Sequence, residues 1–202
     1  MIEGRNITKR FGDRTLFENL SFVIEDGDFV CFSGTSGKGK TTLLNIIGLL
    51  EPFDEGELLI NRKYYTTNKQ KMEYYRSEVG FLFQNFALIE NKTVKQNLEL
   101  IRKESRTQYS IPEVVKIVGM SDMLNSKVYT LSGGEQQRIA LARLFLKKCE
   151  IILADEPTGS LDEKNSEIIL QILLELNLNG KTVIIVTHDN IIKNIARRVI
   201  EL

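Results

Sequence analysis

A glycine-rich segment with the sequence GTSGKGKT occupies residues 34–41, between an apolar run and a run that favours a helix. It fits the pattern G-x-x-x-x-G-K-[ST], in which glycines let successive backbone N–H groups turn inward around phosphate oxygens. A helix that begins near Lys40 directs the positive end of its dipole toward the same anion. Lys40 is therefore expected to reach the β- and γ-phosphates of a nucleotide, and the Thr41 hydroxyl to coordinate Mg²⁺. The residues expected to bind the nucleotide here are Gly34, Thr35, Ser36, Gly37, Lys38, Gly39, Lys40, Thr41 and Thr42.

Two carboxylates follow a second apolar run at residues 151–154. Ligands of α/β sheets bind at the carboxyl ends of the strands, so Asp155 and Glu156 are expected beside the phosphate-binding segment. Asp155 is predicted to associate with Mg²⁺, directly or through water, and Glu156 to polarise the attacking water. Taken alone, two acidic residues after a strand usually form a solvated strand end. The neighbouring phosphate-binding pattern favours the catalytic interpretation.

A second candidate anion site lies at residues 131–138, which read LSGGEQQR. Ser132 and the backbone amides of Gly133 and Gly134 stand at the N-terminus of a predicted helix. In isolation this octapeptide also fits an ordinary serine-capped helix start. Beside the other two motifs it resembles the signature motif of ABC ATPases, and the resemblance implies that a second subunit, packed head to tail, completes each nucleotide site. The residues that this resemblance assigns to nucleotide contact are Ser132, Gly133, Gly134 and Glu135.

The resemblance to ABC ATPases continues in order through nearly the whole chain. It implies that Phe11 stacks on adenine, and that Gln84 links Mg²⁺ and water to a membrane subunit. It further implies that the segment SLD at residues 160–162 crosses the dimer interface, with Asp162 near the nucleotide, and that His188 lies near the γ-phosphate. Two alternatives stay open, because a phenylalanine near a strand end is often part of a core and a single histidine after a strand is often structural.

Together these motifs predict an ATP hydrolase that uses ATP and Mg²⁺. One departure from the family pattern stands inside the phosphate-binding segment, where Lys38 replaces the small residue that the family often carries. The backbone cradle should survive this change, so hydrolysis is expected to survive as well. The resemblance implies the catalytic residues Glu156, His188 and Gln84, and the Mg²⁺ ligands Thr41, Gln84 and Asp155.

The elements that must position these residues follow from apolar periodicity and turn residues. Continuous apolar runs indicate strands covered on both faces, and apolar residues at helical spacing indicate helices. Thr93 with Gln96 predicts a capped helix start, and Pro112 predicts the first turn of another helix that stops at Gly119. The predicted strands are residues 2–9, 20–24, 29–33, 58–60, 79–83, 151–154 and 183–186, and the predicted helices include 40–48, 93–102, 112–119 and 134–147. From residue 151 onward the pattern predicts a strand, a helix, a strand, a helix and a strand, and the first of these helices has its apolar face over residues 168–176.

These elements predict an α/β fold in a single domain over residues 1–202. The resemblance makes it a P-loop NTPase core with a mainly parallel sheet, an N-terminal antiparallel β subdomain and an inserted helical subdomain. Residues 1–85 and 149–202 are expected to form the nucleotide-binding core, and residues 86–148 the helical subdomain.

Composition limits the class of protein. Lys plus Arg and Asp plus Glu both number 27 in 202 residues, and this balance argues against a nucleic-acid partner. No apolar run approaches the roughly 20 residues that span a bilayer, and no signal-peptide pattern opens the chain. The two cysteines, Cys31 and Cys149, adjoin predicted strands and read as core residues of a reducing compartment. The chain is therefore expected to be cytoplasmic and held at the inner face of the membrane by its partner.

Within the family, residues 83–100 (FQNFALIENKTVKQNLEL) look most like the branch that serves lipoprotein release, macrolide or peptide efflux and bacteriocin export. The compact length and the ending at Leu202, where no regulatory domain is expected, resemble lactococcin-type bacteriocin-export ATPases. In that branch the partner is a separate permease with a large extracytoplasmic domain, and the ATPase forms a homodimer. The resemblance leaves two other functions open: transmembrane signalling to cell-wall or division machinery, and a ribosome- or nucleic-acid-associated ATPase.

Overall fold

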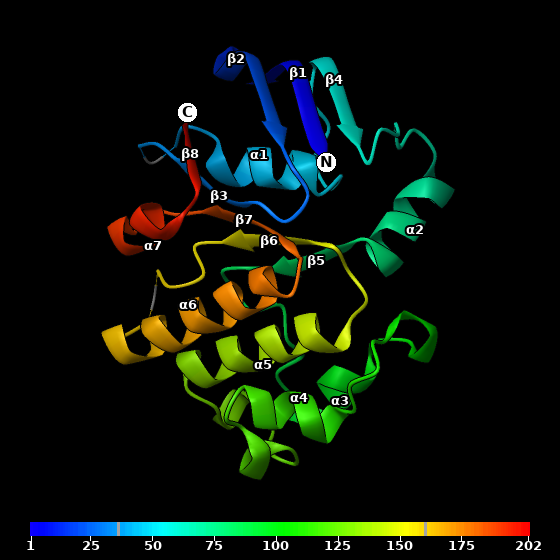
Figure 1. The fold of residues 1–202 in the computed structure, drawn as a ribbon, viewed down its shortest axis with the longest axis vertical. Helices are drawn as coiled ribbons and strands as arrows, with labels where there is room; N and C mark the ends of the chain where they lie inside the picture. The colour runs from blue at the N-terminus through cyan, green and yellow to red at the C-terminus, as the bar shows by residue number, and fades with distance from the viewer. Residues whose placement is uncertain (36, 160) are drawn as a thin grey trace.

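The strands of the computed structural model form two sheets of different kinds (Figure 1). The structure describes residues 1–35, 37–159 and 161–202. The first sheet is antiparallel, and the second has five strands whose neighbours all run parallel. The antiparallel sheet has the order β2 (Arg14–Ile24), β1 (Ile2–Phe11) and β4 (Glu55–Ile60), and the parallel sheet has the order β5 (Val79–Leu82), β6 (Ile151–Asp155), β7 (Thr182–Val186), β3 (Phe29–Ser33) and β8 (Arg198–Glu201).

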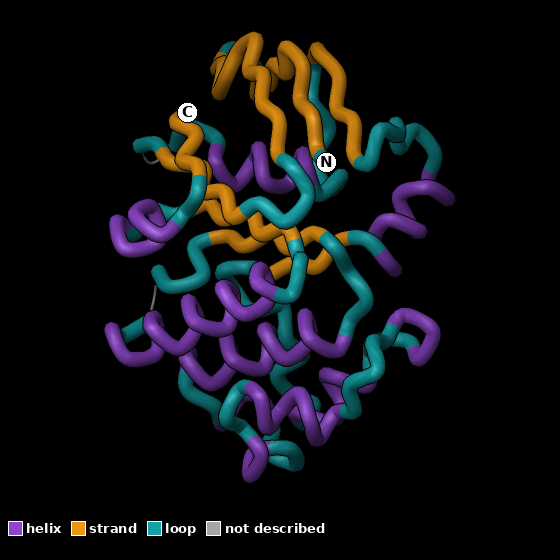
Figure 2. Tube along the Cα trace, viewed as in Figure 1, coloured by secondary structure: helices purple, strands orange, loops and turns teal. Residues whose placement is uncertain are grey.

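Helices cover both faces of the parallel sheet. Helix α1 (Lys40–Ile47) lies between the two sheets, and α5 (Gly133–Leu146) and α6 (Glu163–Leu178) lie on the other face. Figure 2 shows strands gathered in one half of the molecule and most helices in the other. The remaining helices are α2 (Asn68–Ser77), α3 (Val94–Glu99), α4 (Ile111–Ile117) and α7 (Asn190–Ile195), with short 3₁₀ turns at Lys103–Ser105, Ser121–Met123 and Val128–Thr130.

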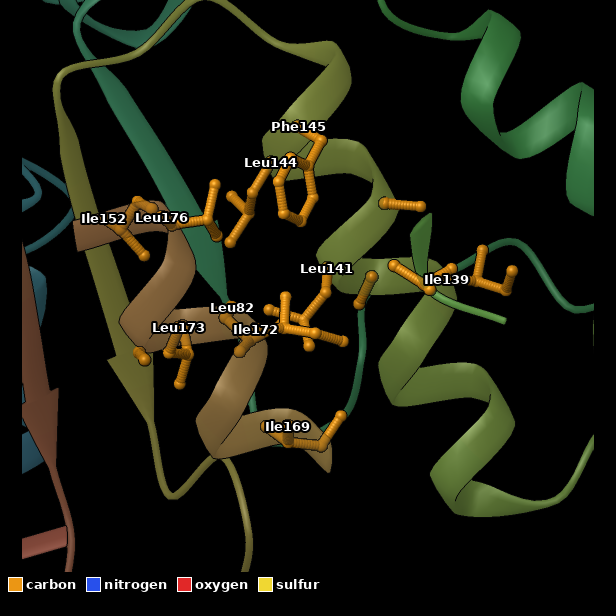
Figure 3. Packing of buried hydrophobic residues seen from close by; sticks show 14 of the residues in the cluster. Leu82, Ile139, Leu141, Leu144, Phe145, Ile152, Ile169, Ile172, Leu173 and Leu176 are labelled. Carbon is orange, nitrogen blue, oxygen red and sulfur yellow. The ribbon is translucent and has the colours of Figure 1, made fainter. Parts of the chain in front are cut away.

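The predicted α/β class, with a parallel sheet and a separate antiparallel sheet, is confirmed. Every residue of β3, β6 and β7 is buried, as expected of parallel strands covered on both faces. One apolar cluster joins α1 to both sheets, and a second fills the space between the parallel sheet, α5 and α6. In Figure 3, Leu141 and Leu144 of α5 point toward α6 and the sheet. Burial of each such side chain contributes about 1.5–3 kcal/mol.

Capping residues set the starts of the central helices as their sequences indicate. Thr93 forms a reciprocal capping box with Gln96 at the start of α3, and Ser110 forms another with Glu113 ahead of Pro112 in α4. The sequence predicts that this helix ends at residue 102, but α3 ends at Glu99. After Leu100 the chain leaves the helix, and the Arg106 guanidinium donates to the Ile101 carbonyl (2.8 Å).

Two further elements differ from the expectation. Strand β2 begins at Arg14 rather than at residue 20, because the turn at Gly12 pairs Arg14 with Phe11 and β-bulges interrupt the alternation that would reveal a strand. Helix α2 was not predicted at all. Only Tyr74 of its ten residues is buried, so its sequence carries no apolar stripe.

The parallel sheet brings three connecting segments to one edge, because the carboxyl ends of β3, β6 and β7 lie side by side. These segments begin at Gly34, Glu156 and Thr187. Among the described residues, no helix is both long and apolar enough to cross a bilayer.

Candidate functional site

A cavity of about 820 Å³ opens at this edge of the sheet. The segments after β3, β5, β6 and β7 line it together with the β1–β2 hairpin. Nine of the residues predicted to act on a nucleotide therefore meet in one place. The lining residues are Phe11, Leu16, Gly37, Gly39, Lys40, Thr41, Thr42, Gln84, Glu156, Gly159, His188 and Asp189.

The floor of the cavity is the segment that leads into α1. Gly34, Gly37 and Gly39 all have positive φ angles, of 150°, 79° and 85°, which side-chain-bearing residues rarely adopt. A Cβ atom on Gly39 would lie only 3.1 Å from the Leu16 side chain. Gly39 is also the N-cap of α1, and it brings no side chain to bond the first-turn N–H groups. These amides face the segment where a phosphate is expected.

Lys40 places a cation at the centre of this loop. Only 7% of its surface is exposed, and its Nζ donates to the carbonyl oxygens of Gly34 (2.8 Å) and Thr35 (3.1 Å). The same nitrogen lies 3.2 Å from His188 Nε2. The Lys40 ammonium group and the His188 ring therefore share one end of the cavity.

Oxygen donors of the kind that Mg²⁺ prefers meet beside α1. The Thr41 hydroxyl donates to Asp155 Oδ1 (3.0 Å), and Gln84 lines the same hollow as these two residues. Burial raises the pKa of the Asp155 carboxyl, while the hydrogen bond from Thr41 opposes that rise. A hydroxyl, a carboxylate and an amide oxygen are hard ligands that suit Mg²⁺ together with phosphate oxygens. Elsewhere in the described ranges, no group of three or more His, Cys, Asp or Glu side chains could hold a metal.

Glu156 is held in an unusual backbone conformation directly after the carboxyl end of β6. Its φ angle is 43°, which is strained for a residue with a side chain, and its N–H continues the strand ladder to Val186. The carboxylate accepts hydrogen bonds from the Thr187 hydroxyl (2.9 Å) and from the His188 backbone N–H (3.4 Å). His188 Nε2 also lies 3.5 Å from Glu156 Oε1. The carboxylate is thus fixed in the cavity with one side toward solvent.

Phe11 lies at the opposite wall of the cavity, at the end of β1. It is 51% exposed, so its side chain is not a core residue. The ammonium group of Lys9 lies 4.5 Å from the centre of the ring and restricts its position by a cation–π contact. An exposed aromatic ring beside a phosphate cradle is suited to stacking on a nucleotide base.

The residues of the LSGG segment lie outside the cavity. Ser132 caps α5: its hydroxyl accepts from the Glu135 N–H, and the Glu135 carboxylate accepts from the Ser132 N–H (2.7 Å) and hydroxyl (2.9 Å). Asp162 likewise caps α6 through the Asn165 N–H (2.8 Å). The chain therefore does not bring Ser132, Gly133, Gly134, Glu135 or Asp162 to its own phosphate loop. Ser36 and Ser160 lie outside the described residues.

Comparison with known proteins gives the family. The family model described as "ABC transporter" matches residues 17–159, which is more than half of the chain. The chain belongs to the ABC transporter family. The motifs at residues 34–41, 131–138 and 155–156 all lie within the matched region, and the chain carries an ABC ATPase domain, as the resemblance implied.

Several relatives place the chain within this family. It is 39% identical to the macrolide export ATP-binding/permease protein MacB of Campylobacter jejuni strain 81-176, over all of this chain and 33% of MacB. It is 38% identical to the ABC transporter ATP-binding protein MJ1508 of Methanocaldococcus jannaschii, over 95% of that protein. The chain spans about a third of the length of the MacB relatives that it matches.

Solved ABC cassettes share the fold. The dimeric structure of the cassette MJ0796 superposes with a TM-score of 0.87 at 38% identity, over all of this chain and 94% of that one. A dimeric post-hydrolysis state of MJ0796 bound to ADP and Pi gives a TM-score of 0.86 at 36% identity. The predicted fold class is therefore shared with ABC cassettes throughout.

The structure adds residues of this ABC domain that the sequence patterns did not assign. Leu16, Gly159 and Asp189 line the cavity, and Thr187 orients Glu156. Asp189 also accepts from the Thr158 hydroxyl (3.1 Å). The sequence signal for Thr187 and Asp189 was present, since both flank His188 in the segment VTHD.

Proposed function

We propose that this chain is the ATP-binding subunit of an ABC transporter, and that two copies hydrolyse ATP to drive export through a membrane permease. The observation that carries this proposal is the meeting of Lys40, Thr41, Glu156 and His188 around one cavity, with Asp155 bonded to Thr41 beside it. The equal numbers of basic and acidic residues, 27 each, support a protein partner rather than nucleic acid.

Each residue has a distinct chemical task in this proposal. Lys40 and the amides at the start of α1 bind the β- and γ-phosphates. Thr41, Gln84 and Asp155 hold Mg²⁺, which when bound neutralises charge on the phosphates. Glu156 accepts a hydrogen bond from the attacking water and orients it, and Thr187 fixes the carboxylate for that task. His188, 3.2 Å from Lys40, donates to an oxygen of the γ-phosphate.

A homodimer completes the site. Phe11 and the phosphate loop act on the nucleotide within one copy, while Ser132, Gly133, Gly134, Glu135 and Asp162 face the nucleotide of the other copy. Two facts support this arrangement: those five residues lie outside the cavity of their own chain, and the MJ0796 cassette is dimeric.

The decisive experiment measures mass by light scattering with the Glu156→Gln variant, which retains ATP because it cannot orient water. With Mg²⁺ and ATP the variant is expected to double its mass, and with ADP it should remain a monomer. A matched variant, Lys40→Ala, should stay monomeric with ATP because it loses phosphate binding. A Glu156→Gln protein that binds ATP and remains a monomer would contradict the composite site.

The membrane partner is proposed as a separate permease with a large extracytoplasmic domain, and the cargo as a peptide, a bacteriocin or a lipophilic compound. The MacB relatives join an ATP-binding part and a permease in one protein, which supports an assembly with a permease at the cytoplasmic face of the membrane. In this chain Ile89, five residues after Gln84, is 44% exposed and suits an apolar contact with such a partner.

An Ile89→Asp substitution tests that contact, because a buried, unpaired carboxylate should weaken the complex with the permease by about tenfold or more. Leu178, at the end of α6, is 82% exposed and provides the matched control variant Leu178→Asp. Both proteins should hydrolyse ATP normally when alone. If Ile89→Asp copurifies with the permease as well as the control does, the permease binds elsewhere.

A further inference from the structure

The turn that follows Gln84 has a strained backbone. Phe86 and Ala87 have φ angles of 62° and 47°, so two consecutive residues with side chains adopt the left-handed region. Such residues cost free energy and persist only where their surroundings impose the conformation. Within the turn, the Phe86 N–H donates to Phe83 (2.9 Å) and the Ala87 N–H to Asn85 (2.7 Å). These bonds do not explain why the turn is stable, since either of them could form in an ordinary turn.

Arg143 holds this turn from α5. Its guanidinium donates one N–H to the Ala87 carbonyl oxygen (2.6 Å) and another to the Phe86 carbonyl oxygen. The planar fork of a guanidinium matches two adjacent acceptors, and both acceptors here belong to the two strained residues. The side chain thus binds the turn in a backbone conformation that presents both carbonyl groups to one guanidinium.

Arg143 is an unusual cation. Among the described residues no ion pair includes it, and burial lowers its pKa to about 10. It stays charged at neutral pH, and the two carbonyl dipoles are the partners that offset its desolvation. A partly buried charge without a carboxylate partner adds little to stability by itself, so its two hydrogen bonds to the turn point to a positional task.

A second contact joins the same turn to the other end of α5. The Phe86 ring lies against Gly133, with Cζ 3.8 Å from the position of a Cβ atom there. Gly133 follows Ser132, the cap of α5. The turn after Gln84 therefore touches α5 both at its start and, through Arg143, near its end.

We propose that Arg143 is a positioning residue that locks the turn after Gln84 onto α5, so that Gln84 and the LSGG segment move as one body. The proposal rests on the proposed function, because Gln84 is assigned there to the Mg²⁺ site with Thr41 and Asp155. In this arrangement Arg143 touches no reacting atom. It fixes the direction in which Gln84 enters the cavity.

Lys147 gives a matched control on the same helix. It too is a partly buried cation that donates to two carbonyl oxygens, those of Tyr75 and Val79 (2.5 Å each). Burial lowers its pKa, as it does for Arg143. Its acceptors lie outside the turn after Gln84, so Lys147→Met removes a similar buried cation without releasing that turn.

Hydrogen exchange tests the lock without any need for activity. In Arg143→Lys a single ammonium group replaces the fork, so the fold is kept while the paired bonds are lost. The Phe86 and Ala87 amides should exchange about tenfold faster or more, and amides of β6 should not change. Lys147→Met should leave Phe86 and Ala87 unchanged. Unchanged exchange at these two amides in Arg143→Lys overturns the lock.

Kinetics test the link to Gln84. Arg143→Lys should lower kcat about tenfold and raise the Mg²⁺ concentration for half-maximal activity, while ATP binding stays normal. In a Gln84→Ala background the same substitution should change kcat less than twofold, because the two residues act through one position. Additive losses overturn the link to Gln84. A wild-type protein without ATP hydrolysis would instead reject the proposed function, and the exchange measurement would still decide whether the lock exists.

Discussion

Two helix N-termini of this molecule are predicted to bind phosphate, and they differ in how they are capped. Helix α1 begins at Gly39, which offers no side chain to its first turn. Helix α5 begins at Ser132, whose hydroxyl bonds the Glu135 N–H while the Glu135 carboxylate returns to Ser132. The first N-terminus is open within a cavity, and the second is satisfied by its own residues.

The two helix starts also differ in the groups that surround them. At α1 the surrounding residues come from the same chain, with Lys40 buried and Asp155 bonded to Thr41. At α5 the hydrogen bonds from Ser132 lower the pKa of Glu135, so a negative charge stands at the helix start where a phosphate is expected. A phosphate must therefore displace or tolerate this carboxylate. We infer that the α1 site binds ATP in the single chain and that the α5 site acts only when a second copy presses a nucleotide against it.

The largest expected effects separate binding from chemistry at the α1 site. Lys40→Ala removes a charge that contacts phosphate before and during the reaction, so both ATP affinity and turnover should fall. Glu156→Gln keeps the shape but not the carboxylate, so ATP should bind normally while kcat falls about 100-fold or more. Equilibrium binding of a fluorescent ATP analogue and steady-state hydrolysis measure the two effects. Equal affinity and equal loss of rate in both variants would contradict this division of tasks.

A mixing experiment tests whether the α5 site serves the other copy. Ser132→Asp keeps a good helix cap but adds a second negative charge, so its homodimer should be inactive, as should that of Lys40→Ala. Mixed dimers contain one site with an intact phosphate loop and an intact α5 start. If sites act independently, a one-to-one mixture should recover up to about a quarter of the wild-type rate, since half of the dimers are mixed and each has one of two sites.

The mixing experiment has a different expected result if each chain completes its own nucleotide site. If each chain used its own Ser132, every chain in the mixture would carry one defect and no activity would return. Size-exclusion chromatography of differently tagged variants confirms that mixed dimers form. If ATP hydrolysis returned although no mixed dimers formed, a contaminating ATP hydrolase would explain the activity, and a composite site would not.

The sequence predicted the parts of this site that are local in the chain. The phosphate loop, the carboxylates after β6 and the cap of α5 each depend on residues within a few positions of one another, so residue types and spacing indicate them. Buried parallel strands were also readable, because burial on both faces leaves continuous apolar runs.

The parts that the sequence did not predict depend on distant or atypical residues. The bonds from Arg143 reach back 56 and 57 positions to Ala87 and Phe86. Neither of those residues favours positive φ, so no turn pattern marks the strained segment. Helix α2 was missed because tertiary contacts hold it, including the bond from the Tyr74 hydroxyl to the Ile47 carbonyl.

A smaller effect is expected from changing the charge at the α5 site. Glu135→Gln keeps the capping box, since Gln also serves at that position, and removes the negative charge that faces an incoming phosphate. In a Glu156→Gln background this change should lower the ATP concentration for half-maximal dimerisation about two- to fivefold, as expected for one charge at a helix terminus. Light scattering across an ATP titration measures it. Weaker dimerisation would show that the Glu135 carboxylate assists the nucleotide instead of opposing it.

The smallest expected effect concerns the stability of the preformed α1 site. Burial raises the pKa of Asp155 above its ordinary value, so the protonated form favours the folded state. The stabilising contribution is complete below the unfolded pKa and is lost as pH rises through the higher folded pKa. At neutral pH the ionised carboxylate therefore costs stability.

Asp155→Asn removes the charge and still accepts from Thr41, so in the absence of nucleotide its Tm at pH 7 should exceed that of the wild type by about 2–4 °C. The Tm difference between Asp155→Asn and the wild type should narrow as pH falls toward 4, because the Asp155 carboxyl of the wild type becomes neutral. With Mg²⁺ and ATP the order should reverse, since the carboxylate then gains the cation that its position suits. A Tm gap at pH 7 that did not change with pH would show that the charge of Asp155 is not the cause.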